Sequence, residues 1–158
     1  MATKASVAWT GVIRQAIPAG VIAGVCFELY QWLTTVLPVH ESITAQWQWI
    51  ASAAIGPVAY ANPAFAWLGL AFHFAASIGW AAGYAYFARL QPAVNARWYI
   101  SGFFFGIVVQ MFMTLLLLGA HTFVFPATPN TFLNEVLAHA VFFGIPLAFV
   151  VARLDQKP

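Results

Sequence analysis

The sequence contains very few charged residues. Six Lys and Arg and four Asp and Glu make up only 6% of the 158 residues, whereas 63% are hydrophobic and the mean hydropathy is +0.83. A water-soluble protein of this length needs many more charged and polar side chains to cover its surface. The composition therefore excludes an ordinary soluble domain and predicts a protein whose main partner is the lipid bilayer.

Cysteine and common catalytic motifs are also scarce or absent. Cys26 is the single cysteine, so no disulfide can form within the chain. The sequence contains no Gly-x-x-x-x-Gly-Lys, no Gly-x-Ser-x-Gly and no His-Glu-x-x-His motif. The basic residues are too few and too scattered for a nucleic-acid-binding surface. The sequence thus gives no indication of an enzyme and excludes a nucleic-acid partner.

Four apolar segments are long enough to cross a bilayer, which takes roughly twenty residues of helix. They are 13–37, 64–88, 98–119 and 132–152. No small-residue cleavage pattern follows the first segment, so we expect it to be a retained span and not a signal peptide. The predicted fold class is an all-α polytopic membrane protein in which residues 1–158 form a single four-helix transmembrane domain.

The basic residues lie on one side of the predicted spans. The connections 38–63 and 120–131 contain neither Lys nor Arg. All six basic residues lie before or at the start of the first span, between the second and third, or after the fourth: Lys4, Arg14, Arg89, Arg97, Arg153 and Lys157. The positive-inside rule therefore predicts that both termini and the middle connection are cytoplasmic.

The first outer connection, 38–63, is rich in aromatic residues and almost uncharged. Ser42 is a good N-cap, and four residues that share one helical face follow it: Ile43, Trp47, Ile50 and Ala54. This pattern predicts a short helix that lies in the outer membrane interface. We interpret its tryptophans as interface anchors and not as residues that stack on a substrate.

Small residues spaced four apart recur in three of the spans, in the half that we expect to be cytoplasmic. Such pairs let helix backbones approach closely in lipid. The pairs are Gly20 and Gly24, Gly79 and Gly83, and Gly102 and Gly106. They predict tight packing of that half, and the sequence leaves open which pairs pack within the chain and which pack between copies. Because four short spans form a narrow bundle, we expect a homo-oligomer.

Polar side chains occur at matching depths in all four spans. At 1.5 Å per residue, Glu28, His73 and Gln110 lie about 13 to 14 Å below the outer ends of their spans. His139 lies about 10 Å down, and Glu135 is one helical turn above it. Ionisable side chains within a bilayer face the bundle interior by default. We therefore predict an outward-facing polar pocket formed by these five residues.

The leading functional hypothesis is that this pocket handles protons, an ion or a small polar solute, because carboxyl and imidazole groups exchange protons near neutral pH. In one alternative, His73 and His139 are axial ligands of a haem b, or bind a single metal ion. In a second alternative, the chain is a structural or accessory subunit. Glu135 is then a first-turn acid near a helix N-terminus, and Gln110 joins neighbouring helices.

Three stretches resemble the YagU-like family of bacterial inner-membrane proteins, whose activity is not established. They are LGLAFHFAASIGWAAGYAYFARLQP, GFFFGIVVQMFMTLLLLG and LNEVLAHAVFFGIPLAFVVARL. The resemblance falls on His73, Gly83, Tyr84, Gln110, Glu135 and His139. It implies a multi-helix protein of the bacterial cytoplasmic membrane that is linked to acid tolerance. The chain departs from the family around Gln31, so a role for Glu28 rests on physical reasoning alone.

Overall fold

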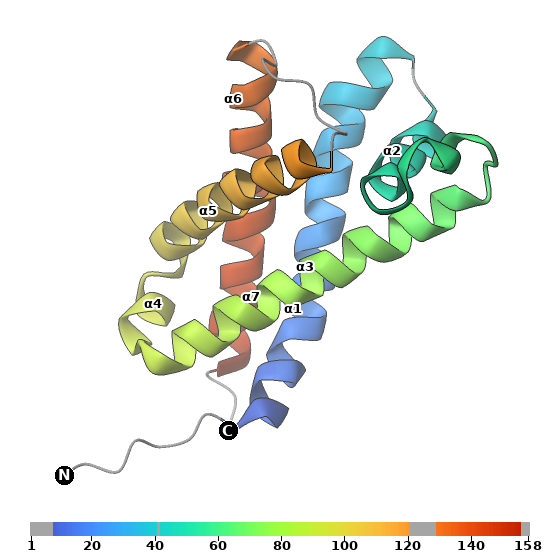
Figure 1. Cartoon of the computed structure of the whole chain (residues 1–158). Helices are drawn as coiled ribbons and strands as arrows, with labels where there is room; N and C mark the ends of the chain where they lie inside the picture. The colour runs from blue at the N-terminus through green and yellow to red at the C-terminus, as the bar shows by residue number, and fades with distance from the viewer. Residues whose placement is uncertain (1–7, 41, 121–128, 156–158) are drawn as a thin grey trace.

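The computed structural model describes residues 8–40, 42–120 and 129–155, and these residues form an all-helical bundle (Figure 1). Four helices are long and apolar enough to cross a membrane: Trp9–Val36, Phe65–Leu90, Trp98–Gly119 and Thr131–Asp155. They confirm the predicted all-α polytopic fold. The first begins four residues before its predicted bound, and the other bounds agree within three residues.

Two of the spans are interrupted by π-helical turns. The first span consists of α1 (Trp9–Gln31) and the π-helix η1 (Trp32–Val36), and the 3-10 helix η2 (Leu37–Val39) follows it. The fourth span consists of α6 (Pro129–Leu137), the π-helix η4 (Ala138–Gly144) and α7 (Ile145–Asp155). The second and third spans are the unbroken helices α3 (Phe65–Leu90) and α5 (Trp98–Gly119). Shorter helices connect them: α2 (Ile43–Ile55), η3 (Gly56–Tyr60) and α4 (Pro92–Ala96).

The first and fourth spans stand side by side, and α3 and α5 cross them obliquely (Figure 1). Helix α1 packs against α3 on one side and against η4 and α7 on the other, while α5 packs against η4 and α7. We call the end of the bundle that carries α2 the upper end, and the end that carries α4 the lower end, as drawn in Figure 1.

Small side chains form the buried contacts between the spans. The fully buried residues include Ala16, Ala19 and Ala23 of α1, Ala81 and Ala85 of α3, and Ala148 and Val151 of α7. Lipid tails are as apolar as these side chains, so burial alone does not hold the helices together in a bilayer. Close packing of the backbones supplies the attraction, and small side chains make that approach possible.

The three glycine pairs differ in what they contact. Gly20 and Gly24 face α3, where an added Cβ would meet the Ile78 backbone and the His73 ring respectively. Gly102 and Gly106 face the fourth span, where an added Cβ would meet the backbone of Gly144 and His139. Gly79 and Gly83 are exposed, and an added Cβ at either would meet no described atom within 4 Å. Two of the pairs therefore lie where helices of the same chain pack closely, whereas the pair on α3 does not.

A buried hydrogen-bond network joins three spans at the lower end. Gln15 of α1 is 1% exposed and accepts a hydrogen bond of 2.9 Å from Nε of Arg89 on α3. Its amide nitrogen donates to the carbonyl of Val151 and to Oδ1 of Asp155, both at 3.3 Å. Because a buried amide left without partners would cost free energy, this network fixes the lower ends of α1, α3 and α7 relative to one another.

The short helix predicted after the first span is α2, and its predicted N-cap is confirmed. Ser42 Oγ accepts a hydrogen bond of 3.1 Å from the Ala45 backbone nitrogen. The inner face of α2 carries Gln48, Ala51 and Ser52, and α2 packs on α3 at Gly69. Helix α2 therefore lies against the upper part of α3.

Candidate functional site

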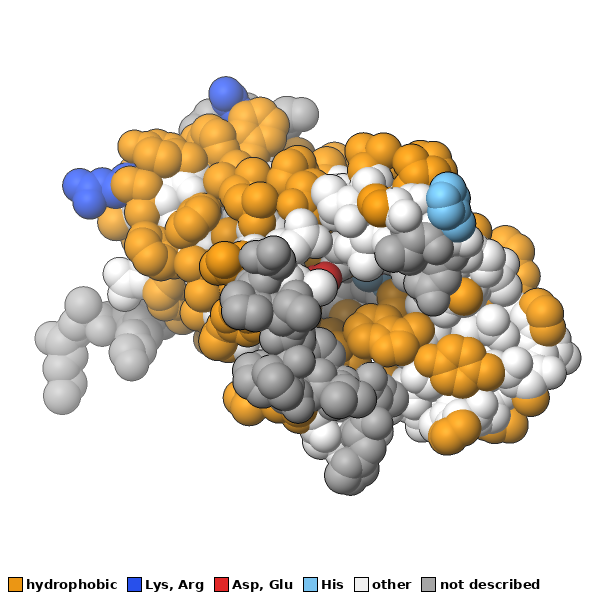
Figure 2. All heavy atoms as spheres, turned by 90° about the horizontal axis from the view of Figure 1, so that it is seen from above, with side chains coloured by type: hydrophobic (Ala, Val, Ile, Leu, Met, Phe, Trp, Pro, Cys, Tyr) orange, Lys and Arg blue, Asp and Glu red, His pale blue; other side chains and the backbone are white. Residues whose placement is uncertain are grey.

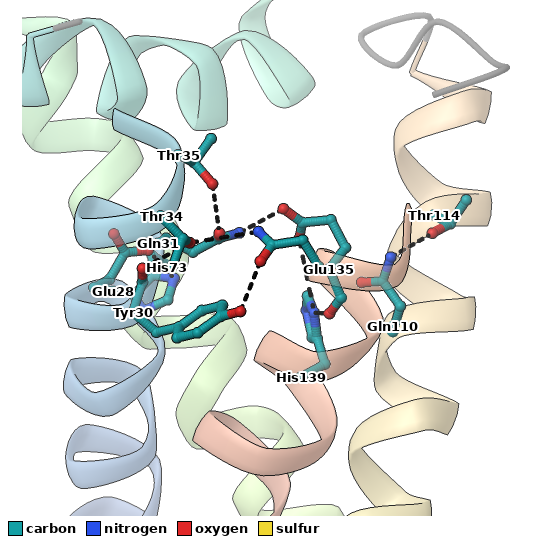
Figure 3. A network of polar contacts seen from close by, with 11 residues as sticks. Glu28, Tyr30, Gln31, Thr34, Thr35, His73, Gln110, Thr114, Glu135 and His139 are labelled. Carbon is teal, nitrogen blue, oxygen red and sulfur yellow. Dashed lines mark hydrogen bonds and ion pairs between the residues drawn. The ribbon is translucent and has the colours of Figure 1, made fainter. Parts of the chain in front are cut away.

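Glu28 of α1 and His73 of α3 form a close pair (Figure 3). Oε1 of Glu28 lies 3.3 Å from Nδ1 of His73, and the two side chains are 13% and 11% exposed. The other ring nitrogen, Nε2, lies 3.3 Å from the carbonyl oxygen of Gly24. The helices approach closely here because Gly20 and Gly24 have no side chains, so the ring of His73 reaches the backbone of α1.

These contacts define where the hydrogens of the pair are. A carbonyl oxygen only accepts, so Nε2 of His73 must carry the hydrogen that it donates to Gly24. Nδ1 then approaches Oε1 of Glu28 favourably only if one further hydrogen lies between them. Either the carboxyl group is protonated, or the ring is an imidazolium beside a carboxylate. In both forms the pair holds one proton more than an ionised glutamate beside a neutral histidine.

Helix α2 completes the surroundings of this pair. Nε2 of Gln46 donates to Oε2 of Glu28 at 3.0 Å. The ring of Trp47 packs edge-on against the ring of His73, with centroids 5.6 Å apart. From the sequence alone, the tryptophans of this segment are expected to anchor the membrane interface, and Gln46 has no predicted role. No sequence signal could have shown that Gln46 bonds to Glu28, because the position of α2 depends on tertiary packing.

Glu135 and His139 belong to a second polar cluster, which joins the first and fourth spans (Figure 3). Oε1 of Glu135 accepts a hydrogen bond of 2.7 Å from Nε2 of Gln31 on α1. Nδ1 of His139 donates to the backbone carbonyl of Glu135 at 2.9 Å and lies 3.9 Å from its carboxyl Oε2. Oε1 of Gln31 in turn accepts from Thr35 at 3.1 Å. Glu135 is thus held by a residue of another span and does not simply lie in interfacial water.

Tyr30 adds a further polar contact beside the second cluster. Its hydroxyl donates to Oδ1 of Asn134 at 2.6 Å, and Nδ2 of Asn134 donates to Thr34 Oγ1 at 3.4 Å. The ring of Tyr30 stacks on Phe142 with centroids 4.1 Å apart. These contacts hold α1 against α6 and η4 at the level of Glu135.

The ring of Phe27 packs against both histidines. Its ring centroid is 5.9 Å from that of His73 and 4.5 Å from that of His139. Both imidazoles therefore contact the same phenylalanine ring. Haem ligands need a free ring nitrogen, and Nε2 of His73 is already bonded to Gly24 while Nδ1 faces Glu28. This arrangement does not fit the haem alternative.

A metal site finds no support in the described residues either. Within 8–40, 42–120 and 129–155, no three side chains of His, Cys, Asp or Glu come together in a way that could hold a metal ion. Metal sites in proteins usually have at least three such ligands. The arrangement of the described residues therefore does not favour the alternative in which His73 and His139 bind a metal ion.

Gln110 of α5 lies beside the second cluster. It is 4% exposed and donates to Thr114 Oγ1 of its own helix at 3.2 Å. One turn away, Gly106 contacts the backbone of His139, so Gln110 lies beside the fourth span (Figure 3). Among the described residues, its hydrogen bond does not reach Glu28 or His73. Four of the five predicted residues thus form two bonded clusters, and the fifth lies next to them.

Both π-helical turns occur at these clusters. The η1 segment begins directly after Gln31, and η4 contains His139. Pro146 follows η4 and has no backbone N–H, so the fourth span cannot keep a regular hydrogen-bond pattern there. Short π-helical turns inside helices are rare and often lie at functional sites. Their position here supports a functional interpretation of the two clusters.

The upper face of the molecule is mostly hydrophobic. Seen from above, orange hydrophobic side chains dominate the described surface, and a red acidic side chain is visible near the middle of the face (Figure 2). A carboxyl group is therefore visible from this end of the bundle.

Comparison of the chain with protein-family models, curated proteins and solved structures found no match. The fold and the site define a class: a helical protein suited to cross the membrane four times, with two carboxyl–imidazole clusters inside its bundle. The resemblance to the YagU-like family stays a prediction.

Proposed function

We propose that this protein binds and releases protons inside the membrane at the Glu28–His73 pair, as a step in the movement of an ion or a small solute. The observation that carries this proposal is the hydrogen bond from Nε2 of His73 to Gly24, which leaves Nδ1 facing Glu28. The pair therefore has a place for one exchangeable proton. An isolated charge would be costly in this environment, and pairing reduces that cost.

The second cluster supports the same function. From the elements packed against α1, the titratable groups at the level of the pair are His73 of α3, Glu135 of α6 and His139 of η4. Helices α2 and α5 contribute the amides of Gln46 and Gln110. Glu135 lies above His139 on the fourth span, toward the upper end. We propose that protons reach Glu28 from the upper end of the bundle. Glu135 lies closer to that end than His139 does.

We propose that the upper end faces away from the cytoplasm of a bacterial cell and that the membrane is the inner membrane. Four arginines support this orientation, because Arg14, Arg89, Arg97 and Arg153 all lie at the lower end of the bundle. An exchangeable proton site on the outer side is compatible with the acid tolerance that the YagU-like resemblance implies.

We further propose that the protein forms a homo-oligomer through α3. Gly79 and Gly83 support this, because the other two glycine pairs pack against helices of the same chain whereas these two are exposed. A second copy of α3 could approach this face as closely as α3 approaches α1.

The function can be tested by current measurements on the purified protein in a solid-supported membrane. A rapid pH drop on the upper side should move charge into the protein and give a transient current. Glu28→Gln should remove this current, because the amide cannot exchange a proton. Gln46→Leu is the matched control, since it changes a neighbour of Glu28 and keeps the carboxyl group. Equal currents in the wild type and Glu28→Gln would contradict the proposal and favour a purely structural role.

A further inference from the structure

Beside Glu28, a cavity of about 330 Å³ lies between α1, α2 and α3. Eight residues line it, and Glu28 is the only one with an ionisable side chain: Val25, Glu28, Leu29, Trp32, Ile43, Trp47, Leu70 and Phe74. Cavities for small ligands have volumes of roughly 300 to 1,000 Å³ and are mostly apolar, with a few polar groups that orient the ligand. The volume of this cavity lies at the lower end of that range, and its lining is apolar except at Glu28.

Three of the eight residues that line the cavity are aromatic. Trp32 of η1, Trp47 of α2 and Phe74 of α3 contribute rings, and the last two also pack on His73 with centroids 5.6 and 5.1 Å away. The side toward the lipid is open, because Leu29 is 56% and Trp32 is 40% exposed. A ligand could therefore enter sideways from the upper leaflet without crossing the polar clusters.

We propose that this cavity binds a hydrophobic monocation, such as a quaternary ammonium ion or a protonated amine, with Glu28 as its counter-ion. Aromatic rings attract such cations through their π faces, and a carboxylate neutralises the charge. The aliphatic residues Val25, Leu29 and Leu70 suit the apolar part of the ligand. The inference rests on the proposed function, because it names the class of solute that the proton site serves.

When the cation binds, the pair releases its proton. If Glu28 is protonated, it releases its proton to water and the carboxylate remains with the cation. If His73 holds the proton, the ring releases it and becomes neutral, again leaving one carboxylate with one cation. In both cases one cation enters and one proton leaves, so the charge in the site does not change.

The test uses benzyltrimethylammonium as the probe and isothermal titration of the full-length protein in detergent. The heat is measured in two buffers that differ in ionisation enthalpy, which counts the protons released. We expect saturable binding with one proton released per cation. The apparent affinity should rise about tenfold for each pH unit while the pair still holds its proton. Neopentylbenzene, which replaces the charged nitrogen by carbon, is the neutral control and should not compete.

Two variants test whether Glu28 and Trp32 bind the cation. Glu28→Gln should reduce the affinity at least about tenfold, as expected for loss of a paired charge. Trp32→Leu should weaken binding of the cation, whereas Trp49→Leu, which changes a 38% exposed tryptophan outside the cavity lining, should not. Thermal unfolding of each variant shows whether it is folded. If Glu28→Gln does not fold, the comparison of Trp32→Leu with Trp49→Leu decides the question.

Several results would overturn the inference. These are no binding of the probe, equal binding to the wild type and Glu28→Gln, or equal competition by neopentylbenzene, which would indicate a groove for lipid chains. If the pH-driven current depends on Glu28 but the cation does not bind, the inference fails and the proposed function stands. If the cation binds through Glu28 without releasing a proton, the cation site stands and the proposed proton exchange fails.

Discussion

At the level of single residues, glycines determine where the ionisable side chains of different spans can meet. A Cβ added at Gly24 would lie 3.1 Å from Nε2 of His73, so this glycine lets the imidazole reach the backbone of α1. Gly106 has the same role for α5 and the fourth span, since an added Cβ would meet the backbone of His139. The positions of both histidines thus depend on glycines in neighbouring helices.

This dependence predicts opposite effects for two Gly→Ala substitutions. Gly106→Ala should lower the free energy of unfolding by about 1 to 3 kcal/mol, because the added methyl group overpacks the contact with η4. Gly83→Ala should leave the monomer unchanged or stabilise it by up to about 1 kcal/mol, because alanine favours the helix and the site is open. Unfolding in mixed detergent measures both. Equal effects of the two substitutions would show that the packing of α5 is not as described.

The depths of the polar residues could be predicted from the sequence, but their partners could not. The rise of a helix fixes how far Glu28 and His73 lie from the ends of their spans. The rotation of each helix about its axis depends on packing between helices, and the sequence does not fix it. For this reason the predicted common pocket is, in the structure, a Glu28–His73 pair and a separate cluster in which Gln31 bonds to Glu135.

At the level of helices, the fourth span differs from a regular α-helix where it carries His139. The segment η4 runs from Ala138 to Gly144 and ends just before Pro146. Pro146 by itself indicates a weak point in this helix, because proline removes a backbone hydrogen bond. The sequence did not predict that a full π-helical segment precedes the proline. A comparable segment, η1, follows Gln31 and has no proline within it.

The irregular helix predicts uneven protection of backbone amides in the fourth span. Amides of η4 should exchange with solvent at least about tenfold faster than those of α5 between Gly102 and Gln110, which have a regular pattern. Pro146→Ala restores the missing N–H and should slow exchange in η4. Hydrogen exchange followed by mass spectrometry in nanodiscs measures both. Equal protection of the two helices would contradict a locally opening fourth span.

At the level of the whole molecule, the distribution of arginines predicts the orientation in the membrane. In a Cys26→Ser background, Ala61→Cys lies near the upper end and Ala96→Cys near the lower end, and both positions are exposed. A maleimide that cannot cross the membrane should label Ala61→Cys, and not Ala96→Cys, when added to spheroplasts. The reverse labelling would invert the proposed topology and place the acidic site on the cytoplasmic side.

The exposed glycines of α3 predict how copies associate. In the same background, Gly83→Cys should form disulfide-linked dimers in the membrane under mild oxidation. Val108→Cys on α5 is the matched control, because it is also exposed, at 57%, but has no small-residue face. It should form dimers to a much smaller extent. Similar dimer yields at the two positions would argue against association through α3.

The proposed function depends on one exchangeable proton at the Glu28–His73 pair. Difference infrared spectroscopy over a pH series, in H₂O and D₂O, detects a carboxylic acid C=O band or an imidazolium ring band when that proton is gained or lost. The structure predicts such a band in the wild type, its loss in Glu28→Gln, and its persistence in Glu135→Gln. An unchanged pH-dependent spectrum in Glu28→Gln would show that the proton is held elsewhere and would contradict the proposed function.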